Sequence, residues 1–310
     1  MTTRRNSATG LQQILWYTSY LFLRVLSGLI NLLPAETAEA VARTIGRAIY
    51  YLLPGRRCVA MANLTIAFGD RVSVVEKKEL TKRAFEHIAV NFMEVFRISR
   101  LLEGDVKETF TIKGLEHFDN ALARKKGIIF VVSHIGSWEY LAFLFYLTGY
   151  PCAVVVKEVR NAYIFKWLNS MRRRATLNVI HKENTRSAIK AILCELSNNR
   201  IVAVLIDQWA GNDAPWVDFF GEAASTTAIP ARLALKTGCA LVPGACIRKA
   251  SGKYEITIFP ELPVSAKTED LISVTKGLNH LLEKQIRENP EQWIWTHKRW
   301  KGKKIYADKR

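Results

Sequence analysis

The chain has 310 residues, 49% of them hydrophobic, and a formal net charge of +17 at pH 7. This composition supports a sizeable core in one large domain or two small ones, and the charge favours an anionic partner such as nucleic acid, a membrane surface, or an acidic protein or lipid. The five cysteines are scattered and form no Cys-x-x-Cys pair. We therefore expect reduced core cysteines, and the sequence offers no evident zinc site.

Residues 11–33 are strongly apolar, interrupted by Arg24, Ser27 and Gly28. The stretch is long enough to span a bilayer, and amphipathic enough to lie in the membrane interface with its aromatic residues at headgroup depth. A buried core helix is the alternative, and a cleaved signal peptide fits less well because Arg24 splits the apolar run. We expect residues 1–33 to be a helical membrane anchor. The arginines that follow favour keeping the remainder on the cytoplasmic side.

The remaining residues, 34–310, are expected to form one α/β domain with a basic C-terminal tail. Helices are predicted at 34–53, 76–102, 138–147, 162–174, 186–197, 226–236 and 268–288, and strands at 110–114, 128–132, 153–156, 201–206, 240–247 and 254–259. The alternation of strands and helices after Gly127 predicts a mainly parallel sheet flanked by helices.

The most informative stretch begins with the apolar run 128–132, which predicts a strand buried on both faces. His134 follows the strand, Gly136 and Ser137 are expected to provide the turn and the helix N-cap, and Glu139 falls in the next helical turn. Ligands bind beyond the carboxyl ends of such strands, and a carboxylate on one imidazole nitrogen leaves the other free as a base. The alternative is a histidine that only caps a strand, with Glu139 favoured by the helix dipole.

Residues 133–139, Ser-His-Ile-Gly-Ser-Trp-Glu, resemble the His-x4-Glu motif of the lipid A late acyltransferases, membrane-associated enzymes of Gram-negative bacteria within the lysophospholipid acyltransferase superfamily. The commonest family form has Asn where this chain has Ser137. Further stretches resemble the family and stand in the family's order: one precedes the motif, at 63–68, and four follow it, at 204–208, 216–221, 226–227 and 291–301. The Glu-Gly-Thr-Arg block of glycerophosphate acyltransferases is absent, which counts against a glycerol phosphate acceptor.

The resemblance implies O-acyl transfer to a lipid. His134 would be the general base for an acceptor hydroxyl, and Glu139 the carboxylate that orients it. No cofactor, metal or nucleotide is implied. Acyl carrier protein would carry the donor thioester, and an anionic glycolipid, a phosphorylated Kdo-bearing lipid A precursor, would be the acceptor. The place implied is the inner membrane, with the active site on the cytoplasmic side.

Two alternatives stay open. The same chemistry could act on another membrane lipid, of the ornithine or phosphoinositide type. The chain could also be a basic membrane-surface or nucleic-acid-binding protein without catalysis. The sequence has no nucleic-acid motif and no array of stacking aromatic residues, so we expect no nucleic acid partner.

Other polar candidates are three consecutive arginines and an acid at a strand end. Arg172 to Arg174 form either a solvated basic face or a clamp for phosphate or carboxylate, and the resemblance places an arginine here, which we assign to Arg173. Asp207 and Gln208 follow the predicted strand 201–206 and resemble the family's Asp-Gln block, so we expect them to bind substrate. The alternative for Asp207 is a simple strand-to-loop cap.

Aromatic residues are expected to line an acyl-chain channel: Trp138, Phe219 and Phe220, with ordinary core packing as the alternative for the two phenylalanines. His297 lies in a basic, Trp-rich terminal block. We expect it to be structural or to contact phosphate, because neighbouring positive charges disfavour a protonated imidazole. The basic tail, 298–304, should add diffuse attraction to an anionic membrane.

Overall fold

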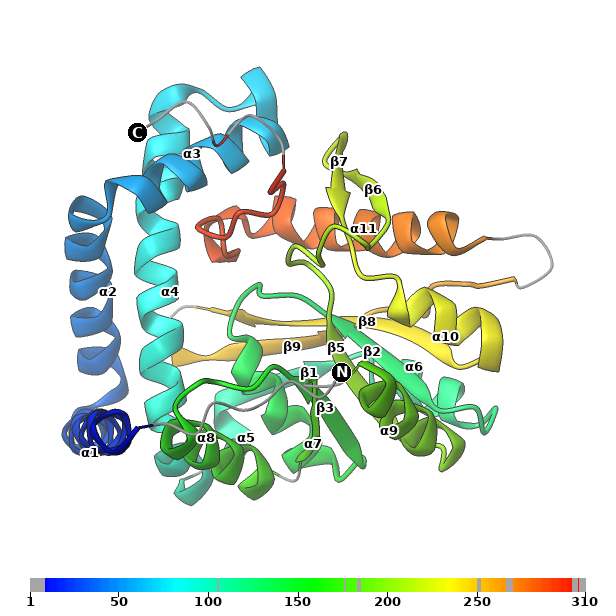
Figure 1. The fold of residues 1–310 in the computed structure, drawn as a ribbon, viewed down its shortest axis with the longest axis horizontal. Coiled ribbons are helices and arrows are strands. Elements are labelled where there is room, and N and C mark those ends of the chain that lie inside the picture. The colour runs from blue at the N-terminus through cyan, green and yellow to red at the C-terminus, as the bar shows by residue number, and fades with distance from the viewer. Residues whose placement is uncertain are drawn as a thin grey trace.

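The computed structural model describes residues 9–104, 106–175, 177–182, 185–249, 252–265, 270–302 and 306. Its centre is a seven-stranded sheet in the order β1-β9-β8-β2-β5-β3-β4, with helices on both faces (Figure 1). The strands are β1 (Phe110–Lys113), β2 (Ile128–Val132), β3 (Cys152–Val156), β4 (Leu177–His181), β5 (Ile201–Leu205), β8 (Ala240–Arg248) and β9 (Tyr254–Ile258), and a separate hairpin joins β6 (Trp216–Phe219) to β7 (Glu222–Ser225). The predicted α/β class with a mainly parallel sheet is confirmed.

The strands from β8 to β4 are all parallel, and β9 and β1 at one side run in the opposite direction. The longer helices are α1 (Gly10–Leu32), α2 (Ala35–Leu52), α3 (Pro54–Phe68), α4 (Val74–Glu103), α6 (Leu115–Leu122), α7 (Ala142–Thr148), α8 (Ala162–Arg174), α9 (Thr185–Ser197), α10 (Ile229–Thr237) and α11 (Leu271–Glu288). Single turns complete the set at α5 (Val106–Thr109), η1 (Gly69–Arg71), η2 (Trp138–Leu141) and η4 (Pro290–Gln292).

Alternate residues of the central strands belong to two separate cores, because successive side chains in a strand point to opposite faces. Ile129 and Val131 of β2 pack in one core with α3, α9, α10 and α11. Phe130 and Val132 pack in the other core with α6, α7 and α8. Burial on both faces is why these strands appear in the sequence as uninterrupted apolar runs.

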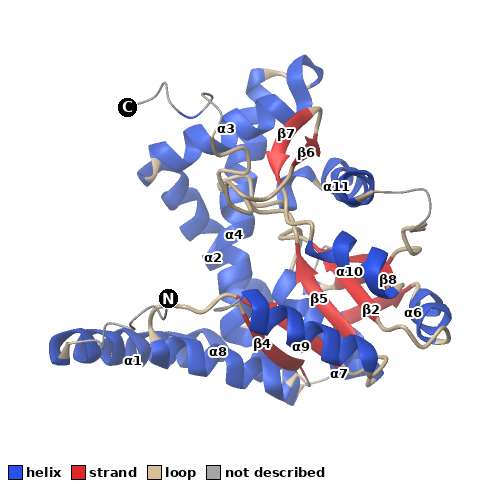
Figure 2. Ribbon diagram, turned by 45° about the vertical axis from the view of Figure 1, so that its right-hand side comes forward, coloured by secondary structure: helices blue, strands red, loops and turns tan. Residues whose placement is uncertain are grey.

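The N-terminal helices form a layer at one end of the sheet. Helix α2 runs alongside the long helix α4, and α1 lies across their ends next to α8 (Figures 1 and 2). The Ser27 hydroxyl donates to the Phe96 carbonyl (3.0 Å), and the Asn161 amide before α8 donates to the Trp16 carbonyl (2.9 Å). These contacts use one side of α1. Exposed apolar side chains occupy the other side: Leu11, Ile14, Leu15, Leu21, Phe22, Val25, Leu29 and Leu32.

Within the described part of the chain, no helix combines the length and apolar content needed to cross a bilayer. The division at residue 33 that the sequence suggests stays a prediction, although α1 ends at Leu32 and α2 begins at Ala35.

Several local expectations differ from the structure. The predicted helix 138–147 is a 3₁₀ turn, η2, followed by α7, and Ser137 gives η2 no side-chain cap because its hydroxyl donates to Glu94 (2.9 Å). Strand β4 was not predicted, since as an edge strand it mixes buried and exposed residues. Helix α3 occupies a stretch to which we assigned no element, and the β6–β7 hairpin lies where only a loop was expected.

Candidate active site

The loop after β2 turns at Gly136, whose φ is 59°. A Cβ atom at this position would collide with the carbonyl oxygen of Cys246, so only glycine fits. The Ser137 amide donates to the same Cys246 carbonyl (2.7 Å), and the Gly136 amide donates to the carbonyl of Gln292 (2.9 Å). The loop is thereby fixed between β8 and the C-terminal segment, and His134 stands at the carboxyl end of β2.

Asp207 is the carboxylate that orients His134. Its Oδ1 lies 2.8 Å from Nδ1 of His134, and its Oδ2 accepts from the His134 backbone amide (2.9 Å) and from the Trp293 indole (2.8 Å). Burial alone would raise the pKa of Asp207, but the His134 ring and these hydrogen bonds outweigh burial and lower the pKa to about 2. An ionised Asp207 accepts the Nδ1–H proton of His134. The Nε2 atom is therefore the basic nitrogen of the ring.

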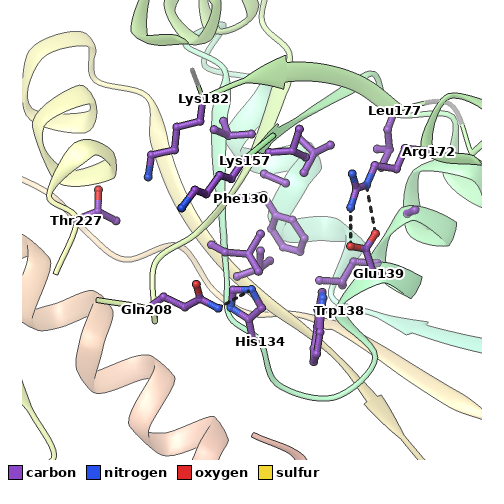
Figure 3. A pocket seen from close by; sticks show the side chains of 18 of the residues that line it. Phe130, His134, Trp138, Glu139, Lys157, Arg172, Leu177, Lys182, Gln208 and Thr227 are labelled. Atoms are coloured by element: carbon purple, nitrogen blue, oxygen red, sulfur yellow. Dashed lines mark hydrogen bonds and ion pairs between the residues drawn. The ribbon is translucent and has the colours of Figure 1, made fainter. Parts of the chain in front are cut away.

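The expectation that Glu139 orients His134 is wrong. Both carboxylate oxygens of Glu139 accept from Arg172, at 2.7 Å (Nη2 to Oε1) and 3.3 Å (Nε to Oε2). Figure 3 shows this pair on a different wall of the cavity from His134. The physical reason is the 3₁₀ geometry of η2, which directs Glu139 towards the last turn of α8 instead of back to the end of β2.

Among the three consecutive arginines, Arg172 lines this cavity and Arg173, to which the resemblance led us to assign the role, does not. Arg173 lies on a separate surface depression beside Asn178 and His181. Arg174 pairs with Glu103 at 3.3 Å in an exposed position. Helical spacing alone does not separate the two, because Arg172 and Arg173 follow the buried Asn169 by three and four residues. In the structure it is Arg172 that donates to the Asn169 side chain (3.2 Å).

A cavity of about 560 Å³ opens beside His134 (Figure 3). One wall is the sheet face that points towards α7, and Leu141, Ala142 and Phe145 close the cavity opposite it. Trp138 lies on the wall, with its ring 5.2 Å from that of His134. The apolar residues from the sheet are Phe130, Val132, Val154, Val155, Val156, Leu177, Ala203 and Leu205, and the polar ones are His134, Glu139, Lys157, Arg172, Lys182, Gln208 and Thr227. An apolar cavity with a few convergent polar groups is typical of a ligand site.

The sequence matches the family described as bacterial lipid A biosynthesis acyltransferase over residues 7–302. The chain belongs to this family. It is 26% identical over 305 residues, 97% of each chain, to the lipid A biosynthesis lauroyltransferase of Escherichia coli. It is 25% identical over 224 residues, 72% of each chain, to the phosphatidylinositol mannoside acyltransferase of Mycolicibacterium smegmatis. The Escherichia coli lipid A biosynthesis palmitoleoyltransferase is 24% identical over 279 residues, 88% of each chain.

Membership confirms the family expected from the His134 block and supports acyl transfer to a lipid acceptor. Gln208 adds a donor beside His134: its amide Nε2 lies 3.3 Å from Nε2 of His134. An amide nitrogen can only donate, so it contacts the lone pair that a hydroxyl substrate would use. Both residues of the expected Asp-Gln pair thus lie at His134, but Asp207 is buried beneath it and only Gln208 lines the cavity.

The acyl-channel expectation for Phe219 and Phe220 is wrong, because neither side chain lines the cavity. Both are buried. Phe219 packs against Trp293 and Trp300 with ring centroids 5.8 and 5.6 Å apart, and Phe220 packs against Trp295. The β6–β7 hairpin turns them into the core, so the core-packing alternative holds for these two residues.

The terminal block, residues 291–301, packs behind the site. Burial lowers the pKa of His297 to about 4, although the charge of Asp207 opposes this shift. Arg299 is fully buried and donates to the Thr226 hydroxyl (2.7 Å), so it supports the core. Residues 303 and 304 of the predicted basic tail lie outside the described residues.

A buried polar network between α4 and β8 lies behind the loop that carries His134, residues 133–139, and the sequence reasoning missed it. Glu94 pairs with Arg248 (2.7 Å) and accepts from the Ser137 and Tyr254 hydroxyls (both 2.9 Å). Arg248 also donates to Nδ1 of His87 (2.8 Å). Burial and then the charge of Arg248 lower the pKa of His87 well below its usual range, which keeps the ring neutral.

A signal for this network was present in the predicted helix 76–102. His87, Asn91 and Glu94 follow one another at intervals of four and three residues, so they share one face of the helix. That face points inward, and Arg248 also donates to the Asn91 carbonyl oxygen (2.7 Å). Polar residues repeated on an inward face indicate a buried network rather than a solvated surface.

Proposed function

We propose that this acyltransferase moves a fatty acyl group from a thioester carried by acyl carrier protein to a hydroxyl group of a lipid A precursor. The observation that carries the proposal is His134, oriented by an ionised Asp207, at the edge of an apolar cavity. Family membership supplies the reaction class. The site supplies a base for the hydroxyl and an apolar space for the acyl chain.

His134 acts as general base in the proposed reaction. Nε2 takes the proton of the acceptor hydroxyl while the oxygen attacks the thioester carbonyl. The tetrahedral intermediate then expels the thiolate, which recovers the proton from the imidazolium, so an ester and a free thiol leave. Asp207 stabilises the imidazolium and holds its tautomer. The Gln208 amide, which contacts Nε2 in the resting site, yields this position to the hydroxyl.

Glu139 and Arg172 serve the acceptor in this proposal. The two hydrogen bonds to Glu139 fix the guanidinium of Arg172 on the cavity wall. A fixed guanidinium is suited to an anionic group of a phosphorylated lipid. Glu139 thus positions Arg172, and the His-x4-Glu motif contributes a base from its first residue and an anion-binding arrangement from its last.

The membrane assignment rests on α1. Its exposed apolar side, including Phe22 and Val25, suits burial in the interface of the inner membrane from the cytoplasmic side. The hydrogen bond from Asn161 to Trp16 ties α1 to the segment 157–159 that borders the cavity. An α1 lying in the interface would bring the cavity close to its lipid substrate.

The function is tested with purified enzyme, an acyl carrier protein thioester and a lipid A precursor in detergent micelles, with mass spectrometry of the lipid product. We expect one added acyl chain with the wild type and none above background with His134→Ala. An acyl-enzyme without lipid product, or no reaction with this acceptor, would contradict the proposal.

One observation favours a second candidate acceptor, a phosphatidylinositol mannoside: the chain is 25% identical to a phosphatidylinositol mannoside acyltransferase. The same assay with a phosphatidylinositol mannoside as sole acceptor separates the two. Mass spectrometry of lipid A from a strain lacking the protein gives the same decision in cells: a lipid A one acyl chain short supports the first acceptor.

A further inference from the structure

We propose that Lys157 and Lys182 form an anion subsite that holds a phosphate group on the headgroup of the lipid acceptor. This inference rests on the proposed function and extends it. The lysines lie outside the family-like stretches of sequence, on a wall of the cavity different from that of Arg172 (Figure 3).

Four neighbouring strands deliver polar residues to one edge of the sheet. His134 follows β2, Gln208 follows β5, Lys157 follows β3 and Lys182 follows β4. The strands are parallel and adjacent in the order β2-β5-β3-β4, so these residues line the carboxyl edge, where α/β sheets bind ligands. Strands are about 4.8 Å apart, which places the two lysine backbones about 10 and 15 Å from that of His134.

The two lysines have a fixed relative position. β3 and β4 pair in register up to Val156 and His181, the residues just before them. The Lys182 amide then donates to the Val156 carbonyl (2.8 Å). Both side chains extend into the part of the cavity near Thr227 (Figure 3). The arrangement is therefore set by the sheet and needs no loop closure.

The charge balance of the cavity favours an anion at this place. Glu139 is the one carboxylate among the described residues that line it, and Arg172 already pairs with Glu139. In the described parts of the chain, neither Lys157 nor Lys182 has an ion pair. Both lysines add positive charge to the cavity, and ammonium groups bind phosphate as point charges.

The position of the lysines favours the acceptor over the donor as the source of the phosphate. Lys157 begins the segment whose Asn161 is bonded to the backbone of α1. The chain that begins at Lys157 thus leads from the cavity to the helix that carries the exposed apolar face. A lipid that keeps its tails in the membrane would present its headgroup from this side.

The test compares Lys157→Gln/Lys182→Gln with a matched pair, Lys126→Gln/Lys236→Gln. The control removes the same charge from exposed lysines that precede β2 and β8, at the opposite edge of the sheet. We expect the first pair to raise the KM for the phosphorylated lipid A precursor about tenfold, with the donor KM unchanged. Lys157→Arg/Lys182→Arg should restore most of the loss. On an acceptor treated with phosphatase, wild type and variant should become equal.

A rise in the donor KM instead of the acceptor KM, or an equal loss with the dephosphorylated acceptor, would overturn the subsite. Binding of the phosphorylated and dephosphorylated precursor to the enzyme in neutral detergent, without donor, gives a second measurement that needs no catalysis. If binding depends on the phosphate and on the lysines but no acyl transfer occurs, the subsite is supported and the proposed function is contradicted. If acyl transfer occurs but binding depends neither on the phosphate nor on the lysines, the proposed function is supported and the subsite is contradicted.

Discussion

The two sides of the catalytic loop, residues 133–139, carry opposite kinds of polar chemistry. On the closed side, Glu94 and Arg248 are 5% and 6% exposed and satisfy each other. On the open side, the His134 side chain is 20% exposed and its Nε2 faces the cavity. A buried ion pair can hold a loop in place because each charge is matched by the other. A general base, in contrast, must keep a nitrogen lone pair available for the proton of its substrate. The difference separates the residues that hold the loop in place from those that we propose to react.

On the closed side, the largest effect is expected for Arg248→Met, which leaves the Glu94 charge buried without its partner. We expect the free energy of unfolding to fall by about 3–5 kcal/mol, measured by urea denaturation. The double variant Glu94→Gln/Arg248→Met should recover part of that loss. As a control, Arg174→Met removes the exposed pair with Glu103 and should cost less than about 1 kcal/mol. Equal losses for the two arginines would contradict the role given to the buried pair.

On the open side, the role proposed for Arg172 is tested by comparing two neighbouring variants, Arg172→Met and Arg173→Met. Loss of charge-assisted hydrogen bonds of about 1.5–3 kcal/mol should lower kcat/KM for the acceptor about 10- to 100-fold in the first variant. The second variant should stay within about twofold of the wild type, since Arg173 lies outside the cavity. The measurement is steady-state transfer in neutral detergent. A larger effect at Arg173 would restore the original assignment.

The cavity is tested with Ala203→Phe, which places a ring on its apolar wall. The preferred acyl donor should become shorter, and discrimination against the longest chain should increase about 10- to 200-fold. The measured quantity is the ratio of kcat/KM for long and short thioesters in the same preparation, so a partly unfolded sample does not affect it. An unchanged ratio would mean that the acyl chain lies elsewhere.

The smallest expected effect concerns the terminal block behind the site. The pKa of His297 is about 4 in the folded protein, against about 6.5 for an ordinary histidine. The unfolded chain therefore binds a proton between these values and the folded chain does not, so stability falls as pH drops through this range. His297→Gln should lose less stability between pH 7 and pH 5 than the wild type, in urea unfolding at both values. The exposed His280→Gln serves as control, and parallel pH dependence in all three would contradict the assignment.

The sequence predicted the position of His134 but not its partner. Strand β2 was predicted to the residue because burial on both faces leaves an apolar run. The approach of Asp207 depends on the register that pairs Val132 with Leu205, and that register joins segments about 70 residues apart in a way that local pattern does not encode. The five-residue step from His134 to Glu139 suggested contact, yet one 3₁₀ turn redirected the carboxylate.

We propose that Asp207, and not Glu139, orients His134 as the catalytic base. The direct measurement is kcat at neutral pH for Asp207→Asn and Glu139→Gln under saturating donor and acceptor, each checked for folding by circular dichroism. We expect Asp207→Asn to lose about 10²- to 10⁴-fold, close to His134→Ala, because the imidazolium loses its carboxylate. Glu139→Gln should keep kcat within about tenfold and act mainly on the acceptor KM. A Glu139→Gln enzyme as inactive as His134→Ala, beside an Asp207→Asn enzyme with near-normal turnover, would contradict the claim.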